Sequence, residues 1–125
     1  MAELLADSYA FIEYASGNAA YGRLFEQHSV VTTALNVVEV YASMLRRGVD
    51  PERARLFAQT CLTKVVEVPS GAVLRAAEFR AEMARKRLNC SHIDAWGYAA
   101  AEALGRRFLT GDESFHGLPN VLFVK

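Results

Sequence analysis

Short apolar runs alternate along the chain with longer segments in which apolar residues recur every three or four positions. A short apolar run bounded by turn residues is typical of a buried strand, and the longer spacing indicates an amphipathic helix. Five strands are therefore predicted, over residues 3–6, 29–32, 65–68, 108–110 and 121–124. Helices are predicted between them, over residues 9–14, 19–27, 33–47, 50–64, 70–88 and 91–104.

This alternation of strands and helices decides the expected fold class. Strands that alternate with helices favour a parallel sheet covered on both faces. We therefore expect an α/β fold, a three-layer α/β/α sandwich with a mostly parallel sheet of four to five strands. With 125 residues, the chain is long enough for one core and too short for two, so residues 1–125 are expected to form one domain.

Residues that favour helix starts support these boundaries. Asp50-Pro51-Glu52 combines a capping Asp, a Pro in the first turn and an acid favoured by the helix dipole. Thr32 or Thr33 is expected to cap the helix that ends near Arg47, and Ser70 the helix that ends near Leu88.

The helix over residues 33–47 has one broad apolar face when its residues are placed at about 100° per step. That face is predicted to contain Val37, Val38, Val40, Tyr41, Met44 and Leu45. The remaining narrow polar arc is predicted to contain Asn36, Glu39, Ser43, Arg46 and Arg47. On this pattern alone, Glu39 is an ordinary solvated residue.

Composition and charge narrow the range of functions. The formal net charge of zero argues against a broad polybasic surface. No stretch resembles a transmembrane span, and residues 1–17 lack the basic start of a signal peptide. Cys61 and Cys90 lie far apart, without the CxxC spacing of a zinc site. We expect a cytoplasmic protein with two reduced cysteines and no membrane partner.

Four acidic residues occupy positions at which a parallel sheet builds ligand sites. Asp7 and Asp112 end strands, Asp94 opens a helix, and Glu39 lies in a helix that follows a strand. Each has a structural explanation of its own: a helix cap for Asp7, a capping box with Ser91 for Asp94, and an Asx turn for Asp112. Strand ends and the starts of the following helices share one edge of a parallel sheet, so we expect three of the four acids, Asp7, Asp94 and Asp112, to meet there.

Such a cluster of acids calls for a cation. Carboxylates within ~4 Å of each other repel by up to ~4 kcal/mol per pair at an effective dielectric constant of 20. All-oxygen ligands suit Mg²⁺ or Mn²⁺ better than zinc. The natural chemistry of this arrangement is hydrolysis of a phosphodiester, because a metal ion activates water and neutralises the charge that develops on phosphate.

The order of these motifs resembles that of the PIN-domain nucleases, and more narrowly that of the small VapC-type toxins of toxin–antitoxin pairs. The resemblance rests on Leu5-Ala6-Asp7-Ser8, the helix with Glu39, Ser91-His92-Ile93-Asp94-Ala95, and Leu109-Thr110-Gly111-Asp112 with Phe115. It implies a Mg²⁺- or Mn²⁺-dependent ribonuclease whose catalytic, metal-binding acids are Asp7, Glu39, Asp94 and Asp112. It also implies a homodimer, and an antitoxin protein that blocks the acidic pocket.

The same resemblance suggests supporting residues. Ser8 and Thr110 match hydroxyl positions beside the acids, and Asn36 and Ser114 complete the set of supporting polar side chains. Many family members carry an acid where Ser114 stands, so we expect one tightly held ion rather than two.

Basic residues near the acidic motifs suggest where RNA would bind. Arg85 and Lys86 form an edge that leads into the Ser91 helix, and Arg46 is a further candidate contact for RNA. The alternative for Arg85 and Lys86 is a solvated face with local ion pairs.

Other functions fit parts of the pattern. A housekeeping RNA-processing nuclease without an antitoxin would carry the same acids, and so would a catalytically silent interaction module. A receiver-like signalling domain would need an Asp at the end of the third strand, and Val66-Glu67-Val68-Pro69-Ser70 has none.

Overall fold

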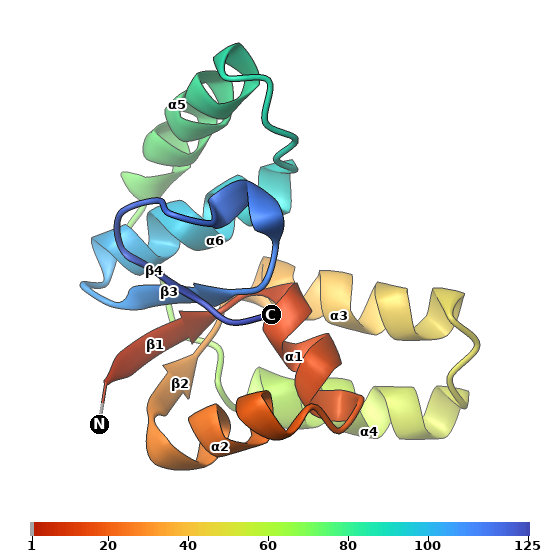
Figure 1. Cartoon of the computed structure of the whole chain (residues 1–125). Helices are drawn as coiled ribbons and strands as arrows, with labels where there is room; N and C mark the ends of the chain where they lie inside the picture. The colour runs from red at the N-terminus through yellow and green to blue at the C-terminus, as the bar shows by residue number, and fades with distance from the viewer. Residues whose placement is uncertain (1) are drawn as a thin grey trace.

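The computed structural model describes residues 2–125, and its sheet contains four parallel strands in the order β2-β1-β3-β4. These are β1 (Glu3–Ala6), β2 (Ser29–Val31), β3 (Arg107–Thr110) and β4 (Val121–Phe123). The register pairs Leu5 with both Val31 and Phe108, so the first strand of the chain lies in the middle of the sheet (Figure 1). The predicted α/β fold with a parallel sheet is confirmed, with four strands.

The prediction of a strand over residues 65–68 is wrong. Val65 forms a single bridge to Thr32, through hydrogen bonds from the Thr32 amide to the Lys64 carbonyl and from the Val66 amide to the Thr32 carbonyl. The ladder cannot continue, because Thr33 already caps the next helix and the chain leaves the sheet edge after Thr32.

Six α-helices and one 3-10 turn complete the described part of the chain. They are α1 (Ser8–Ala15), α2 (Ala19–Gln27), α3 (Ala34–Arg46), α4 (Pro51–Leu62), α5 (Ala72–Arg85), α6 (His92–Ala103) and η1 (Glu113–Phe115). Asp50 and Thr33 cap α4 and α3 as predicted. None of the helices within residues 2–125 combines the length and the apolar character needed to cross a membrane.

Ser70 is not the cap of α5. The chain enters this helix through a turn in which the carbonyls of Pro69 and Ser70 accept hydrogen bonds from the amides of Ala72 and Val73. The residue that precedes the helix is therefore Gly71, which has no side chain with which to cap it.

The helices form two layers on opposite faces of the sheet (Figure 1). Leu4, Ala6 and Leu109 pack on one face against buried residues of α1 to α4. Leu5 and Phe108 point to the other face and pack against α5, α6 and Phe115. The alternation follows from the two-residue period of a strand, and it explains why the buried strands are apolar throughout.

Helix α3 is rotated relative to the prediction. Asn36 and Ser43, which were assigned to the solvated arc, are buried, whereas Val38 is 59% exposed and Leu45 is 43% exposed. The buried face of α3 is set by its neighbours α1, α4 and α6, and short polar side chains fit there when they find hydrogen-bond partners.

Candidate functional site

The four acids singled out in the sequence line one hollow at the carboxyl edge of the sheet. The hollow has a volume of about 510 Å³. Its lining consists of Asp7, Glu39, Asp94 and Asp112 together with Tyr9, Ser91, Gly111, Glu113 and Lys125. We call it the acidic hollow. The acids meet because β1 and β3 are adjacent and parallel, so that Asp7 and Asp112 follow neighbouring strand ends.

Asp7 lies at the floor of the acidic hollow and is 2% exposed. It caps α1, as predicted: its Oδ1 accepts a hydrogen bond from the Ala10 amide at 2.9 Å. Its Oδ2 accepts one from the Thr110 hydroxyl at 2.5 Å. Two hydrogen bonds from different elements hold the carboxyl group in one orientation.

Burial raises the pKa of the Asp7 carboxyl from 3.8 to about 8. The loss of water around the charge is the largest cause, and the negative charges of Asp94 and Asp112 raise it further. The hydrogen bonds from Thr110 and Ala10 act in the opposite direction. Without a cation nearby, Asp7 therefore stays protonated at neutral pH.

Thr110 connects two of the acids. Its hydroxyl donates to Asp7 and accepts a hydrogen bond from the Asp112 amide at 3.1 Å. It is fully buried at the end of β3, which fixes both contacts. Ser8, the other predicted hydroxyl, points elsewhere: its hydroxyl donates to the Asn36 carbonyl at 3.3 Å and joins α1 to α3.

Asp94 forms the predicted capping box with Ser91. Its carboxylate accepts from the Ser91 amide at 3.3 Å, and the Ser91 hydroxyl accepts from the Asp94 amide at 3.0 Å. Burial is the largest cause of a raised pKa for Asp94, and the charges of Glu39 and Asp112 add to it. Capping leaves part of the carboxylate facing the acidic hollow, so the structural role and a functional role coexist.

Asp112 makes the predicted Asx turn. Its Oδ1 accepts from the Ser114 amide at 3.0 Å and lies 2.6 Å from the Ser114 hydroxyl, which also lies 3.0 Å from the Asn89 carbonyl. Ser114 therefore orients Asp112 from two residues further along the chain.

Glu39 and Asn36 differ in their surroundings although both lie on α3. Glu39 is half-buried and lines the acidic hollow, and its carboxylate forms no hydrogen bond or ion pair within residues 2–125. Asn36 is fully buried outside the hollow, with its Oδ1 accepting from the Thr33 hydroxyl at 2.7 Å. Its Nδ2 has no partner within the described residues and faces the space beside Gly97 and Phe108.

The basic residues predicted to contact RNA lie outside the acidic hollow. Arg46, Arg85 and Lys86 are exposed and do not line it. Sequence reasoning missed Glu113 and Lys125, which do line it. An acid directly after Asp112 was a visible signal for Glu113, whereas nothing local in the sequence indicates that residue 125 returns to β3.

A second hollow adjoins the first. It has a volume of about 420 Å³ and shares Ser91, Asp94, Asp112 and Glu113 with the acidic hollow. Its other lining residues are Arg87, Leu88, Asn89 and Ser114. We call it the side hollow.

Comparison with known proteins agrees with this geometry. The model of the PIN domain family matches residues 5–120. The chain belongs to the PIN domain family. No curated protein is similar enough in sequence to count as a relative.

Solved structures with the same fold come from toxin–antitoxin systems. VapBC2 from Rickettsia felis bound to a promoter DNA fragment has 13% identity and a TM-score of 0.75, over 98% of this chain and 97% of that one. A toxin–antitoxin complex from Klebsiella pneumoniae has 19% identity and a TM-score of 0.74, over 95% of both chains. VapC20 from Mycobacterium tuberculosis, a Sarcin-Ricin loop cleaving toxin, has 21% identity and a TM-score of 0.69, over 94% and 98%.

The acidic hollow of this PIN domain suits a hard divalent ion. The side chains in it that can bind a metal ion carry carboxylate oxygens, supplemented by hydroxyl and carbonyl oxygens, and such ligands favour Mg²⁺ or Mn²⁺. No three Asp, Glu, His or Cys side chains among residues 2–125 are close enough to enclose an ion by themselves. Mg²⁺ does not require this, because it keeps several waters and binds through one or two carboxylates.

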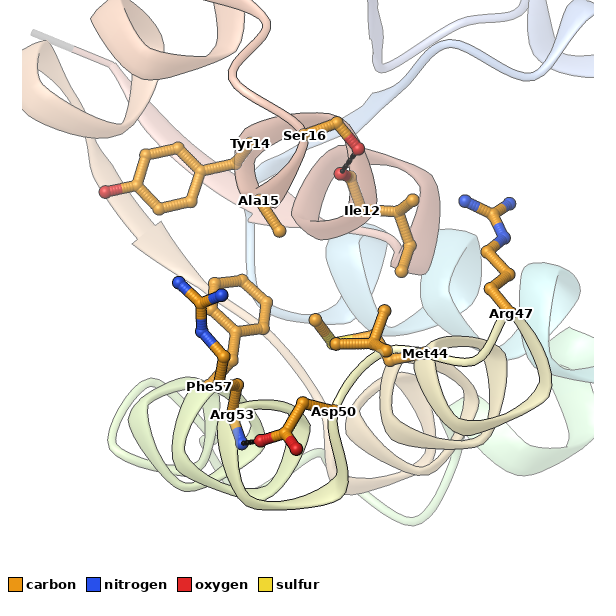
Figure 2. Close-up of a pocket in the computed structure, with 10 residues that line it drawn as sticks. Ile12, Tyr14, Ala15, Ser16, Met44, Arg47, Asp50, Arg53 and Phe57 are labelled. Atoms are coloured by element: carbon orange, nitrogen blue, oxygen red, sulfur yellow. Dashed lines mark hydrogen bonds between the residues drawn. The ribbon is translucent and has the colours of Figure 1, made fainter.

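A larger hollow of the PIN domain lies elsewhere. It has a volume of about 830 Å³, lies between α1, α3 and α4, and contains none of the four acids. Figure 2 shows Tyr14, Met44 and Phe57 lining it, with the guanidinium groups of Arg47 and Arg53 on opposite sides of Met44. We call it the helix groove. Its lining mixes apolar side chains with two arginines and one acid, Asp50.

Proposed function

We propose that this PIN domain is a metal-dependent endoribonuclease and the toxin of a toxin–antitoxin pair. The observation that carries the proposal is the meeting of Asp7, Glu39, Asp94 and Asp112 around one open hollow. Five carboxylates of this chain, counting Glu113, face a space with a single lysine, which is an arrangement for binding cations. The fold shared with toxins of toxin–antitoxin complexes supports the proposal.

Each acid has a role that its surroundings support. Asp7 and Asp112 hold the ion, with Thr110 fixing the first and Ser114 the second. Asp94 adds a carboxylate from the first turn of α6. A bound Mg²⁺ or Mn²⁺ ion would supply Lewis-acid activation of water and neutralise charge on the scissile phosphate. The carboxylate of Glu39 forms no hydrogen bond within residues 2–125 and can therefore accept a proton.

Cleavage of a mixed RNA pool tests the reaction class. Wild-type protein is expected to cleave with Mn²⁺ and to lose cleavage with EDTA. The cleavage rate of Asp94→Asn is expected to fall by more than about 100-fold. A smaller fall, of about 10- to 100-fold, is typical of a residue that only supports a metal ligand. The fold of this variant should persist, because Asn can accept the capping hydrogen bond from the Ser91 amide.

Asp50→Asn provides a matched control for that experiment. Asp50 also caps a helix, with its Oδ2 accepting from the Arg53 amide at 3.1 Å, and it lies outside the acidic hollow. Its substitution should leave cleavage unchanged. If folded wild-type protein binds Mn²⁺ but cleaves no RNA in pools that include structured ribosomal RNA, the ribonuclease proposal is wrong.

We also propose that the helix groove receives a segment of the antitoxin. Arg47 and Arg53 line it and form no ion pair within residues 2–125, so they favour a segment with acidic side chains and an apolar side chain for the floor. Arg53→Glu is expected to weaken binding of the cognate antitoxin by at least tenfold. Arg55→Glu, an exposed position on the same helix outside the groove, should bind as the wild type does.

That pair of variants separates charge at the groove from charge in general. Calorimetric titration of the purified toxin variants with the antitoxin gives the two affinities directly. Equal weakening by both substitutions would show that binding depends on overall charge and would remove the helix groove from the proposal.

Homodimer formation is the third part of the proposal. Leu35 of α3 and Val73 of α5 are exposed and line an apolar hollow that also contains Trp96, and Val38 and Leu74 are exposed on the same two helices. Apolar side chains gathered from three helices favour burial against a second copy of the chain. Light scattering that gave a monomer mass at micromolar concentration would exclude it.

A further inference from the structure

We propose that Lys125 and Arg87 are positioning residues that hold the RNA backbone on the two sides of the acidic centre. The inference rests on the proposed ribonuclease function and assigns it a substrate path. Lys125 is the one basic residue that lines the acidic hollow, and Arg87 is the one that lines the side hollow, among residues 2–125. Because the two hollows share Asp94 and Asp112, they form one trough with a cation toward each end.

The charges in the trough explain why such cations are needed. Asp7, Glu39, Asp94, Asp112 and Glu113 would repel a polyanionic strand along its whole path. A divalent ion offsets this repulsion at the scissile phosphate only. The phosphates on either side still approach carboxylates, and a fixed cation near each of them offsets that repulsion where it arises.

Lys125 is held in place by contacts from three residues. Its ammonium group donates to the Gly111 carbonyl at 3.3 Å, pairs with Glu113 Oε1 at 3.3 Å and lies 5.9 Å from the centre of the Tyr9 ring. The preceding residue is anchored by a hydrogen bond from the Val124 amide to the Thr110 carbonyl at 2.9 Å. An ammonium has three N–H donors, and the Lys125 side chain is 61% exposed, so a donor remains for phosphate.

Arg87 is unusual in its backbone. It has φ of 60° and lies two residues after the end of α5. Its amide donates to the Ala84 carbonyl, and the Leu88 amide donates to the Met83 carbonyl. Helix ends of this type favour glycine at the left-handed position, because a side chain there is strained. An arginine in a strained conformation at the rim of a polar hollow indicates that its side chain is used.

Neighbouring basic residues lack this placement. Arg85 and Lys86 are exposed on the same turn of chain but line neither hollow. They carry the same charge within two residues of Arg87, which makes them matched controls for its electrostatic effect.

Binding of a fluorescein-labelled single-stranded RNA of 12 mixed nucleotides, followed by anisotropy in Mn²⁺, tests the inference. All variants carry Asp94→Asn so that the probe is not cleaved. Lys125→Met and Arg87→Gly are each expected to weaken binding about threefold to tenfold at low salt. Each should also lower the slope of log affinity against log salt by about 0.7, the value for one phosphate contact on a single strand.

Two further variants make the result specific. Lys125→Arg keeps the cation and should retain the wild-type slope, and Arg85→Met with Lys86→Met should change the slope less than Arg87→Gly alone. Arg87→Gly should also melt at a higher temperature than the parent, because glycine relieves the left-handed strain. Weaker binding by a more stable protein cannot come from partial unfolding.

The outcomes separate this inference from the proposed function. If Lys125→Met with Arg87→Gly binds the probe with the parent's affinity and salt slope, the assigned path is wrong. In that case cleavage by otherwise wild-type protein still decides the ribonuclease function independently. In cleavage assays the two single variants should raise KM with little change in kcat, since contacts to flanking phosphates act equally on the ground state and the transition state.

Discussion

Replacing Asp7 with asparagine is expected to abolish RNA cleavage and to stabilise the metal-free protein at the same time. Asp7 is buried at the floor of the acidic hollow, where the pKa of its carboxyl is raised from 3.8 to about 8, chiefly by burial. Asparagine keeps the size of the side chain and the ability to cap α1 through the Ala10 amide. It carries no charge, so both the ionic ligand and the cost of burying it disappear.

The raised pKa fixes the direction of the pH dependence. Between pH 4 and pH 8 the unfolded chain releases a proton that folded Asp7 retains, so the free energy of unfolding of the metal-free wild type falls as pH rises. The slope of this contribution is about 1.4 kcal/mol per pH unit. The contribution of Asp7 to the pH dependence is absent below the pKa that this carboxyl has in the unfolded chain, and it reaches its full size above pH 8. Asp7→Asn should lack it and should gain several kcal/mol over the wild type at pH 8.

Added metal is expected to narrow this difference in stability. Mg²⁺ or Mn²⁺ binds the ionised carboxylates of the wild type and should stabilise it by about 2.7 kcal/mol at a hundredfold excess over the dissociation constant. Asp7→Asn should respond much less. Thermal melts at pH 5 and pH 8, with EDTA and with Mn²⁺, measure all of these effects on one protein preparation.

The exposed cap Asp50 provides the comparison for these melts. Asp50→Asn makes the same chemical change at a helix start, outside the acidic hollow, and should leave both the pH dependence and the metal response as they are in the wild type. A metal-free Asp7→Asn protein that melts below the wild type at pH 8 would contradict the assignment of Asp7 as a buried, destabilising acid. If neither Mg²⁺ nor Mn²⁺ changes the melting temperature of the wild type, the proposed metal site is wrong.

Gly111→Ala is expected to have the second largest effect, because there is no room for a Cβ at residue 111. The added carbon would lie 2.5 Å from the Val124 carbonyl oxygen and would also overlap the Tyr9 ring. The Val124 carbonyl accepts a hydrogen bond from the Tyr21 hydroxyl, so moving it disturbs that contact as well. The loss is expected to be about 3 kcal/mol, at the upper end of the usual range for overpacking.

The same substitution should impair function as well as stability. Gly111 lies between Thr110 and Asp112, and its carbonyl holds Lys125, so a shift there moves groups on two sides of the acidic hollow. We expect the melting temperature to fall by roughly 10 °C. RNA cleavage should fall even at temperatures where the variant remains folded.

Gly22→Ala is the matched glycine substitution. Gly22 lies inside α2, and a Cβ there would meet no atom within 4 Å. Alanine should stabilise that helix by up to about 1 kcal/mol without affecting cleavage. If Gly111→Ala melts together with the wild type, the chain after β4 is free to move and Lys125 is not held as described.

The local sequence predicted most of the helices because their end signals are local. Asp50, Thr33 and Ser91 form caps with amides three residues away, and these contacts need no other part of the chain. Ser70 shows the limit of such signals, because the turn before α5 places Gly71, and not Ser70, at the cap position.

Sheet pairing required the tertiary structure. The run at residues 65–68 has the composition of a strand, yet it lacks a partner because the chain turns into α3 after Thr32. Helix α3 shows the same limit, since the helices packed against it, rather than its own periodicity, bury Asn36 and expose Val38.

The sequence by itself determined that acids would gather at the carboxyl edge of a parallel sheet, because strand ends and helix starts share that edge in any such fold. Only the tertiary structure decided which other residues join them. Lys125 reaches the acidic hollow through the pairing of β3 with β4, and Arg87 borders the trough because α5 ends beside the Ser91 turn. Contacts between residues far apart in the chain depend on packing and register, which no local pattern of hydrophobic and polar residues records.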